Sequence, residues 1–251
     1  MNIAIITGAS SGLGREFARQ LDTMCTDNID EFWLIARRKD RLEDLAKQLE
    51  HECRILPYDI TDTTDIAKLS HKFKSLEPTI RILINCAGFG LIGRFTELNI
   101  DKQLSMIDLN CKSLVKLTYM SLPYMKKNSR IINVASSAAY APQPNFAIYA
   151  ASKAFVDFFN RALAHELSNR KIYITSVCPG PVDTEFFDIA QTDWNMPQWK
   201  TMFIADAKDV VKKALRDSVY KKSVSIYGLT MNTWRIVNRF IPTELLMKIY
   251  K

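Results

Sequence analysis

The chain has 251 residues, and a hydrophobic fraction of 47% is typical of a globular protein with a substantial core. Its formal net charge is +7, but no block of about five or six like charges occurs, which argues against a nucleic-acid-binding tail. No apolar run approaches the roughly 18 residues of a membrane span. The first predicted strand begins at residue 2, so we expect no signal peptide and a cytoplasmic protein.

The cysteines and histidines argue against a disulfide framework and a metal site. Five cysteines are present, an odd number, and no pair has CxxC spacing, which predicts reduced thiols. The three histidines are not in metal-ligand spacing, so no bound metal is expected.

Strand-like and helix-like segments alternate along the chain, which predicts one α/β domain over residues 1–251, with a doubly wound parallel sheet covered by helices on both faces. The seven predicted strands cover residues 2–7, 32–36, 54–57, 81–85, 130–135, 172–177 and 223–227. The predicted helices cover residues 12–25, 40–50, 63–76, 100–126, 148–168 and 206–219, and a C-terminal helical segment follows at about 229–250.

The first predicted strand leads into a glycine-rich turn, Thr7-Gly8-Ala9-Ser10-Ser11-Gly12-Leu13-Gly14, which precedes a helical pattern. This is the context of a dinucleotide-phosphate site, because glycines let the backbone approach a pyrophosphate and the helix N-terminus offers free N–H groups. The spacing is GxxxGxG rather than the commoner GxGxxG, and an ordinary glycine-rich turn is the alternative.

The end of the second predicted strand bears on the choice of cofactor. NAD enzymes place a carboxylate about 20 residues after the glycine motif, whereas NADP enzymes need cations there. Here position 36 is an alanine rather than an acidic residue. Arg37 can form a bidentate pair with a 2′-phosphate, and Ser10 can add a hydroxyl contact to the same phosphate. We therefore expect NADP(H). Solvated Arg37 and Arg38 side chains are the alternative.

Tyr149 and Lys153 lie four residues apart on a predicted helix and so share a face. An ammonium held near a tyrosine lowers the hydroxyl pKa from its ordinary value near 10 toward neutrality, where a general acid-base group works best. Ser136, thirteen residues before Tyr149, follows the fifth predicted strand, where its hydroxyl could donate to a substrate carbonyl. Ser137 is the adjacent alternative. A serine hydrolase is disfavoured because no GxSxG elbow occurs.

These segments resemble the short-chain dehydrogenase/reductase family over nearly the whole chain. The glycine turn matches its cofactor motif, Asn85-Cys86-Ala87-Gly88 resembles its NNAG motif, and Ser136 and Tyr149 have its spacing. Pro179-Gly180 follows the sixth strand, as in the family. The runs Ala87-Gly88-Phe89-Gly90 and Pro179 to Phe187 resemble a bacterial subgroup of broad substrate range.

The resemblance implies a Rossmann-like fold, a cofactor-binding part over about residues 1–135, and a catalytic set of Asn110, Ser136, Tyr149 and Lys153. Asn110 would hold a water, and Lys153 would also bind the nicotinamide ribose. The implied cofactor-binding residues are Gly8, Ser10, Ser11, Gly12, Leu13, Arg37, Asp59, Ile60, Asn85, Ala87, Gly88, Tyr149, Lys153, Pro179, Gly180, Val182 and Thr184. Without the resemblance, Asn110 reads as a polar kink in a long helix and Thr184 as a helix N-cap.

Residues 181–205 are rich in aromatic residues and methionine, have no clear period, and correspond to the substrate-binding loop of the family. We expect a lid that orders over an apolar substrate, with a fixed hydrophobic flap as the alternative. Further aromatic candidates for the substrate pocket are Phe89, Phe95, Tyr140 and Phe146.

Two other segments predict contacts between molecules. Helices 100–126 and 148–168 carry apolar residues and, by the resemblance, would pair across a two-fold axis, which predicts a homodimer or homotetramer. The C-terminal segment is apolar at helical spacing and is interrupted by Pro242. It is expected to pack on its own domain or a partner subunit, and peripheral membrane contact is the alternative.

The sequence thus predicts an NADP(H)-dependent oxidoreductase that transfers hydride between the nicotinamide and a carbonyl or secondary alcohol. The aromatic loop favours an apolar substrate such as a keto-lipid, steroid, bile acid or hydrophobic ketone. The alternatives are a 3-oxoacyl reductase acting on carrier-bound acyl chains and a non-catalytic NADP-binding sensor. Such sensors usually lose the tyrosine or the lysine, and both are present here.

Overall fold

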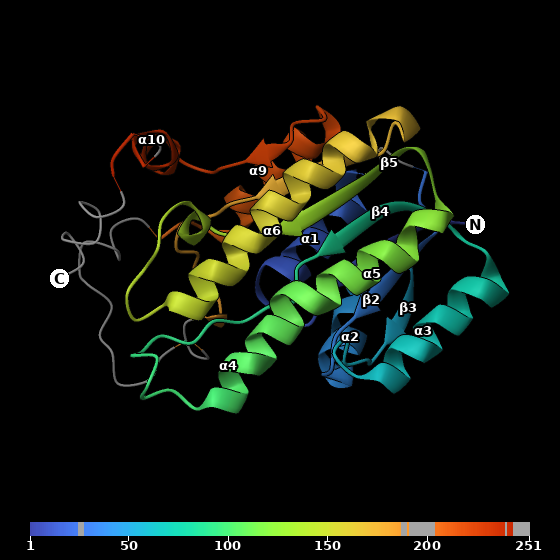
Figure 1. Cartoon of the computed structure of the whole chain (residues 1–251). Helices are drawn as coiled ribbons and strands as arrows, with labels where there is room; N and C mark the ends of the chain where they lie inside the picture. The colour runs from blue at the N-terminus through green and yellow to red at the C-terminus, as the bar shows by residue number, and fades with distance from the viewer. Residues whose placement is uncertain (25–27, 187–189, 191–203, 239, 243–251) are drawn as a thin grey trace.

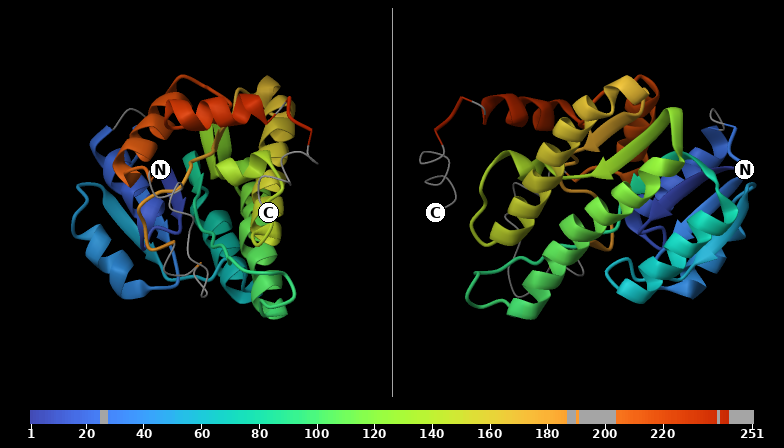
Figure 2. Two further views of the ribbon diagram at one scale, coloured as in Figure 1. Left: turned by 90° about the vertical axis from the view of Figure 1, so that its left-hand side faces the viewer. Right: turned by 45° about the vertical axis from the view of Figure 1, so that its right-hand side comes forward.

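The computed structural model of the chain describes residues 1–24, 28–186, 190, 204–238 and 240–242. A seven-stranded sheet runs through its centre in the order β3-β2-β1-β4-β5-β6-β7. Every neighbouring pair of strands is parallel. Helices cover both faces of this sheet (Figures 1 and 2), which confirms the predicted Rossmann-like doubly wound fold.

The strands are β1 (Asn2–Thr7), β2 (Glu31–Ile35), β3 (Glu52–Leu56), β4 (Thr79–Asn85), β5 (Met125–Val134), β6 (Tyr173–Val177) and β7 (Val224–Ser225). The helices are α1 (Gly12–Met24), α2 (Lys39–Ala46), α3 (Thr63–Leu76), α4 (Ile100–Ile107), α5 (Leu114–Ser121), α6 (Ala147–Glu166), α9 (Ala207–Val219) and α10 (Leu229–Val237).

Alternate residues of the central strands enter two hydrophobic cores. In β1, Ala4 and Ile6 join a core with side chains from α1, α2 and α9, while Ile3 and Ile5 join a second core with side chains from α3, α5 and the end of α6. Because both faces are buried, β1 is apolar almost throughout, as parallel strands usually are. The sheet is thereby packed on both faces, and its carboxyl edge carries the predicted catalytic residues Ser136 and Tyr149.

The predicted helix 100–126 is continuous as far as Tyr124, but it is not α-helical throughout and it ends earlier than predicted. The structure divides it into α4, a π-helical segment Asp108–Ser113, α5 and a 3-10 turn Leu122–Tyr124. Pro123 lies in that turn, and since proline lacks the N–H that an α-helix needs, the helix ends and β5 begins at Met125 instead of the expected residue 130.

Several other boundaries differ from the prediction by one or two residues, and two helices end well before the predicted residue. Helix α2 ends at Ala46 rather than residue 50, because the backbone N–H groups of Glu50 and His51 donate to the buried Asp22 carboxylate instead of continuing the helix. The C-terminal helix α10 ends at Val237, and residues 243–250 of the predicted segment lie outside the described residues.

Candidate active site

The glycine turn between β1 and α1 lies against the turn that follows β4. Gly8 has a φ of 68°, and a Cβ there would lie 2.9 Å from the Ala87 nitrogen. Thr7 holds the two turns together, since its Oγ1 accepts hydrogen bonds from the Cys86 and Ala87 nitrogens at 3.0 and 3.1 Å. A Cβ on Gly14 would collide with the Gly8 carbonyl oxygen. The turn therefore has the close-packed backbone that a dinucleotide phosphate site requires.

An arginine does lie on this turn, but it is Arg38 rather than the predicted Arg37. Arg38 Nη2 donates to Ser11 Oγ at 2.7 Å and to Ser10 Oγ at 3.1 Å. The Arg37 side chain is 78% exposed, and its Nη1 lies 3.9 Å from an Asp59 carboxylate oxygen. The two residues adjoin in sequence, and the direction of the chain after β2 decides which of them faces the glycines.

Two charged residues that sequence analysis missed complete this region. Arg41 Nη1 lies 2.7 and 2.8 Å from the two carboxylate oxygens of Glu185, and Arg38 Nη1 donates to the same carboxylate at 3.1 Å. These hydrogen bonds, that from Arg41 first, hold the pKa of Glu185 below its usual value. Arg41 follows Arg38 by three residues, which places both on one side of the start of α2.

Asn85 and Gly88 have different surroundings, although the resemblance assigned both to cofactor binding. Asn85 Nδ2 donates to Thr118 Oγ1 at 3.1 Å and to Asn133 Oδ1 at 2.8 Å, so the buried Asn85 joins β4 to α5 and β5. A Cβ on Gly88 would lie 2.8 Å from Asn110 Oδ1 and 3.4 Å from Lys153 Nζ. Gly88 therefore adjoins the predicted catalytic residues.

Asn110 lies in the π-helical segment between α4 and α5. Its Oδ1 accepts from the Phe89 nitrogen at 3.1 Å, and its Nδ2 donates to the Phe89 carbonyl at 2.9 Å and to Ser152 Oγ at 3.1 Å. The amide thus fixes the turn after β4 to α6. Such π-helical turns are frequent at functional sites. The expected water-holding role of Asn110 stays a prediction.

The structure brings Ser136, Tyr149 and Lys153 together at the carboxyl edge of the sheet. Ser136 follows β5, while Tyr149 and Lys153 lie on one face of α6. The Ser136 hydroxyl hydrogen-bonds to the Tyr149 hydroxyl. Lys153 Nζ donates to the Val134 carbonyl oxygen at 2.8 Å and lies 5.7 Å from the Tyr149 ring centre. All three side chains are buried.

The expected fall in the tyrosine pKa is not present in this geometry. Burial raises the pKa of Tyr149 to about 12, and the hydrogen bond from Ser136 offsets this only in part. Burial also lowers the pKa of Lys153 to about 8, because desolvation disfavours its ammonium form. The prediction treated Lys153 as a fixed positive charge beside the hydroxyl, whereas here its ammonium hydrogen-bonds to the Val134 carbonyl.

Tyr149 is covered by two phenylalanine rings. The ring of Phe146 stacks on it at 4.2 Å between centres, and the ring of Phe186 is tilted against it at 5.4 Å. Gly90 lies beside these rings, since a Cβ there would be 2.7 Å from Phe186 Cζ and 2.9 Å from Tyr149 Cδ2. Together with the partly buried Phe89, these side chains form an apolar cluster around the tyrosine.

The other two aromatic candidates for the substrate pocket lie elsewhere. Tyr140 belongs to a separate cluster with Cys178 and Met231, and Arg235 of α10 lies 5.8 Å from its ring centre. Phe95 is 55% exposed. Most of the predicted apolar loop, residues 187–189 and 191–203, lies outside the described residues, and this part includes Trp194 and Trp199.

The remaining predicted cofactor residues fall into two groups. Ile60 and Val182 are buried in the two main cores, Leu13 packs partly buried beside one of them, and Gly180 lies against Met231 of α10. Asp59 and Thr184 are partly buried, while Pro179 is buried. Asp59 Oδ1 accepts from Thr61, the Pro179 carbonyl accepts from Ser137, and the Thr184 methyl lies 3.4 Å from a Cβ built on Gly12.

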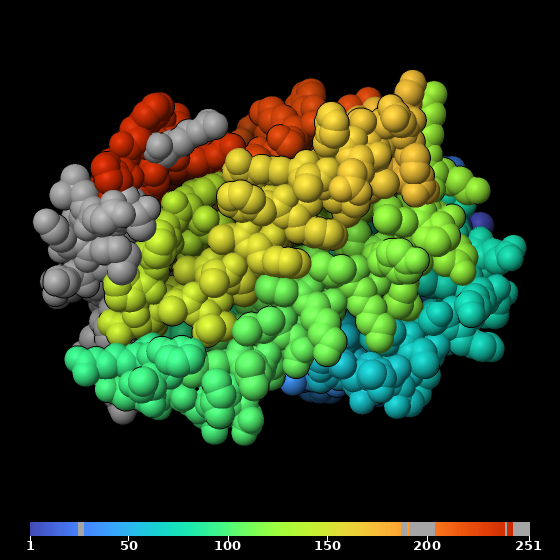
Figure 3. Space-filling view, in the orientation of Figure 1, coloured from blue at the N-terminus to red at the C-terminus, as the bar shows by residue number. Residues whose placement is uncertain are grey.

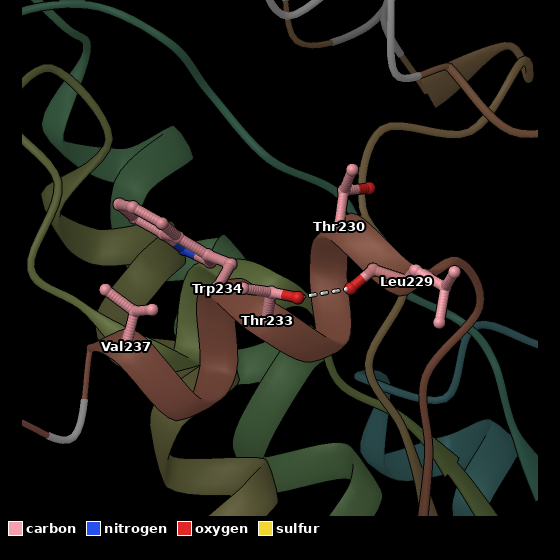
Figure 4. A pocket seen from close by; sticks show the side chains of 5 residues that line it. All are labelled: Leu229, Thr230, Thr233, Trp234 and Val237. Carbon is pink, nitrogen blue, oxygen red and sulfur yellow. Dashed lines mark hydrogen bonds between the residues drawn. The ribbon is translucent and has the colours of Figure 1, made fainter.

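A surface hollow lies apart from these residues. It occupies about 340 Å³ along α10 and is lined by Leu229, Thr230, Thr233, Trp234 and Val237 (Figure 4), so it contains no predicted catalytic residue. Within the described ranges, no cluster of three His, Cys, Asp or Glu side chains could bind a metal ion. The same part of the chain has no helix of the length and hydrophobicity needed to span a membrane.

Comparison with known proteins shows the family of the chain. Residues 2–194 match the short chain dehydrogenase family. An uncharacterized oxidoreductase of Staphylococcus epidermidis is 32% identical over 184 residues, which cover 72% of this chain and 78% of the relative. The chain therefore belongs to the short-chain dehydrogenase family, a class of oxidoreductases.

Two solved structures resemble the whole chain. A short-chain dehydrogenase from Sphingobium yanoikuyae in complex with NADPH has a TM-score of 0.81 and 27% identity, and the match covers 99% of this chain and 96% of that one. A bulky-bulky ketone specific alcohol dehydrogenase from Comamonas testosteroni has a TM-score of 0.76 and 25% identity, with 99% and 94% covered.

Proposed function

We propose that this protein is an NADP(H)-dependent oxidoreductase that interconverts a carbonyl group and a secondary alcohol on an apolar substrate. The observation that carries the proposal is Tyr149, whose hydroxyl meets Ser136 beside buried Lys153 while its ring lies under Phe146 and Phe186. A proton donor under an apolar cover suits a hydrophobic carbonyl compound better than a small polar one.

The glycine turn is the proposed cofactor site. Gly8 and Gly14 allow no Cβ, as expected where a backbone must approach a pyrophosphate, and the N-terminus of α1 lies at the end of this turn, where a helix can bind an anion. Arg38, which contacts Ser10, and Arg41, which shares Glu185 with Arg38, supply positive charge here and favour NADP(H) over NAD(H). When bound, the nicotinamide supplies or accepts the hydride.

The chain's own residues would handle the proton. Ser136 would donate a hydrogen bond to the substrate oxygen as negative charge develops there, and Tyr149 would give or take the proton. Once Lys153 carries its proton, a positive charge near the Tyr149 hydroxyl would favour the phenolate and oppose the effect of burial on the tyrosine pKa. Asn110 would keep the turn carrying Gly88 and Phe89 in place.

We also propose a cytoplasmic location. The free thiols of Cys53, Cys86, Cys111 and Cys178 support a reducing compartment.

The apolar substrate can be tested by following NADPH oxidation with hydrophobic ketones, steroids, bile acids, 3-oxoacyl esters and small polar carbonyl compounds. A preference for polar carbonyls would refute the apolar-substrate proposal, and turnover of 3-oxoacyl esters alone would favour an acyl reductase. Tight NADPH binding without any turnover would indicate a sensor.

A further inference from the structure

Glu185 binds two arginines that lie about 145 residues before it in the sequence. Arg41 contacts both oxygens of its carboxylate, at 2.7 and 2.8 Å, and Arg38 contacts one of them at 3.1 Å. All three side chains are partly exposed. One carboxylate from the segment after β6 thus offsets part of the positive charge at this end of the proposed cofactor site.

Arg38 links this ion pair to the glycine turn. Its Nε and Nη2 atoms donate to Ser10 Oγ, and Nη2 also donates to Ser11 Oγ. The side chains of Ser10, Ser11, Arg38 and Arg41 thus form one donor cluster, which we call the anion site. A guanidinium binds carboxylate and phosphate with the same bidentate geometry, so the anion site can accept either group.

The neighbours of Glu185 extend across the rest of the site. The Thr184 methyl lies against Gly12 of the glycine turn, and the Phe186 ring lies against Tyr149 and Gly90. Residues 184–186 therefore reach from the phosphate-binding turn to the proposed proton donor. The ion pair of Glu185 fixes the middle of this short segment.

Accepting the proposed use of NADP(H), we infer that Glu185 is a specificity-determining residue that competes with the cofactor 2′-phosphate for the anion site. A phosphate monoester carries a charge of about −1.5 to −2 at neutral pH and three acceptor oxygens, against a single charge and two oxygens for the carboxylate. The phosphate would replace Glu185 on Arg38 and Arg41. A cofactor without this phosphate would leave Glu185 in place, with residues 184–186 still held against Gly12 and Tyr149.

The competition can be measured by calorimetric titration of the full chain with 2′,5′-ADP, which carries the 2′-phosphate, and with 5′-AMP, which does not. Glu185→Gln should bind 2′,5′-ADP about fivefold more tightly than wild type, the size expected for removing a competing, partly exposed ion pair. Its affinity for 5′-AMP should stay unchanged. Asp183→Asn is the matched control, because it removes one negative charge two residues away, and both affinities should stay as in wild type.

Arg41→Met tests the other partner of the ion pair. This variant should bind 2′,5′-ADP about tenfold more weakly than wild type, the loss expected for a charge-assisted hydrogen bond. In the double variant Arg41→Met/Glu185→Gln, the affinity for 2′,5′-ADP should rise little above that of Arg41→Met, since one of the two cations that Glu185 binds is already absent. Equal gains from Glu185→Gln in both backgrounds would contradict the inference.

Hydrogen exchange gives a readout independent of affinity. Peptides covering residues 182–186 should exchange faster in wild type on addition of 2′,5′-ADP but not of 5′-AMP, and should exchange fast in Glu185→Gln without either ligand. If Glu185 only braces the site, Glu185→Gln will weaken both ligands together, which overturns the inference. If wild type binds 2′,5′-ADP more tightly than 5′-AMP and Glu185→Gln has the same two affinities as wild type, only the inference about Glu185 is refuted. If wild type binds 2′,5′-ADP and 5′-AMP with equal affinity, the NADP(H) proposal is refuted as well.

Discussion

The Nζ atom of Lys153 lies 5.7 Å from the centre of the Tyr149 ring and donates its hydrogen bond to the carbonyl oxygen of Val134. Helix α6 places both side chains on one face, and the end of β5 supplies the acceptor. Tyr149 therefore has its direct hydrogen bond with Ser136. Lys153 can supply a nearby positive charge only when it is protonated, and burial lowers its pKa and so disfavours that form.

Tyr149→Phe should lower kcat by at least about a hundredfold, the lower range of general acid-base contributions, because only the proton-carrying hydroxyl is removed. The dissociation constant for NADPH should change little, since the ring and its packing on Phe146 remain. Tyr140→Phe, in a separate cluster, is the matched control and should keep its activity. Steady-state kinetics and cofactor titration give the two values. Near-wild-type turnover in Tyr149→Phe would end the proposed role.

Lys153→Met should change how stability depends on pH. The pKa of Lys153 is lowered to about 8 from an ordinary value of 10.5, so between these values the unfolded chain binds a proton that the folded chain does not. Wild type should therefore gain stability relative to Lys153→Met as pH rises from about 8 to 10, by roughly 1.4 kcal/mol per pH unit at most. Urea unfolding at several pH values measures the difference. Lys116→Met, at an exposed lysine, should show no such slope.

Arg38→Ala and Arg37→Ala form a matched pair for cofactor preference. Wild type should bind NADPH more tightly than NADH. Arg38→Ala should weaken NADPH about tenfold or more and NADH less, since Arg38 lies on Ser10 and Ser11. Arg37→Ala should have the smaller effect, because its side chain extends toward Asp59. A larger effect at Arg37 would restore the assignment made from the sequence, and a wild type that prefers NADH would refute both.

Substitution of Phe158 tests the predicted oligomer. Several large apolar side chains are exposed on the helices α4, α5 and α6, which lie side by side on one face (Figure 3). They are Ile100, Leu104, Ile107, Tyr119, Phe155 and Phe158. Exposed apolar side chains gathered on neighbouring helices often mark an interface, and a symmetric copy of the chain is the simplest partner. Light scattering should give a multiple of 28.8 kDa for wild type.

Phe158→Asp, at a side chain that is 72% exposed, should shift this mass toward 28.8 kDa. Phe95→Asp, also at an exposed phenylalanine but outside these helices, should leave the mass unchanged. A monomeric wild type at micromolar concentration would contradict the predicted assembly.

Gly90→Ala should impair catalysis through the position of Tyr149. The added methyl would lie 2.9 Å from Tyr149 Cδ2 and 2.7 Å from Phe186 Cζ, so one of these rings has to move. We expect kcat to fall about tenfold or more, since small displacements of reacting groups are costly. Phe186→Ala in the same chain should recover part of the loss by giving the methyl room. If Gly90→Ala alone retains wild-type kcat, the apolar cluster does not position the tyrosine.

The sequence predicted the order of strands and helices well because its hydrophobic periodicity is a local signal. It could not show the π-helical turn within helix 100–126, since that turn is associated with the packing of Asn110 against Phe89 and Ser152. The end of α2 also depends on a distant residue, Asp22, that binds the following backbone.

The same distinction between local and distant signals applies to the site. Ser136, Tyr149 and Lys153 could be selected because their spacing along the chain reflects their grouping in space. Arg38 and Arg37 have the same chemistry, and only the path of the backbone after β2 separates them. Glu185 gave no signal at all, because its partners lie 144 and 147 residues away in the sequence.

The central place of β1 in the sheet has a consequence for synthesis of the protein. One edge of β1 pairs with β2, which soon follows, but the other edge pairs with β4, whose contacts are nearly 80 residues distant, as between Thr7 and Ile84. On the ribosome this apolar edge stays open until β4 has emerged. Open strand edges invite aggregation, and distant pairings slow folding. We therefore expect this edge of β1 to be most open to aggregation until the chain through Asn85 has left the ribosome.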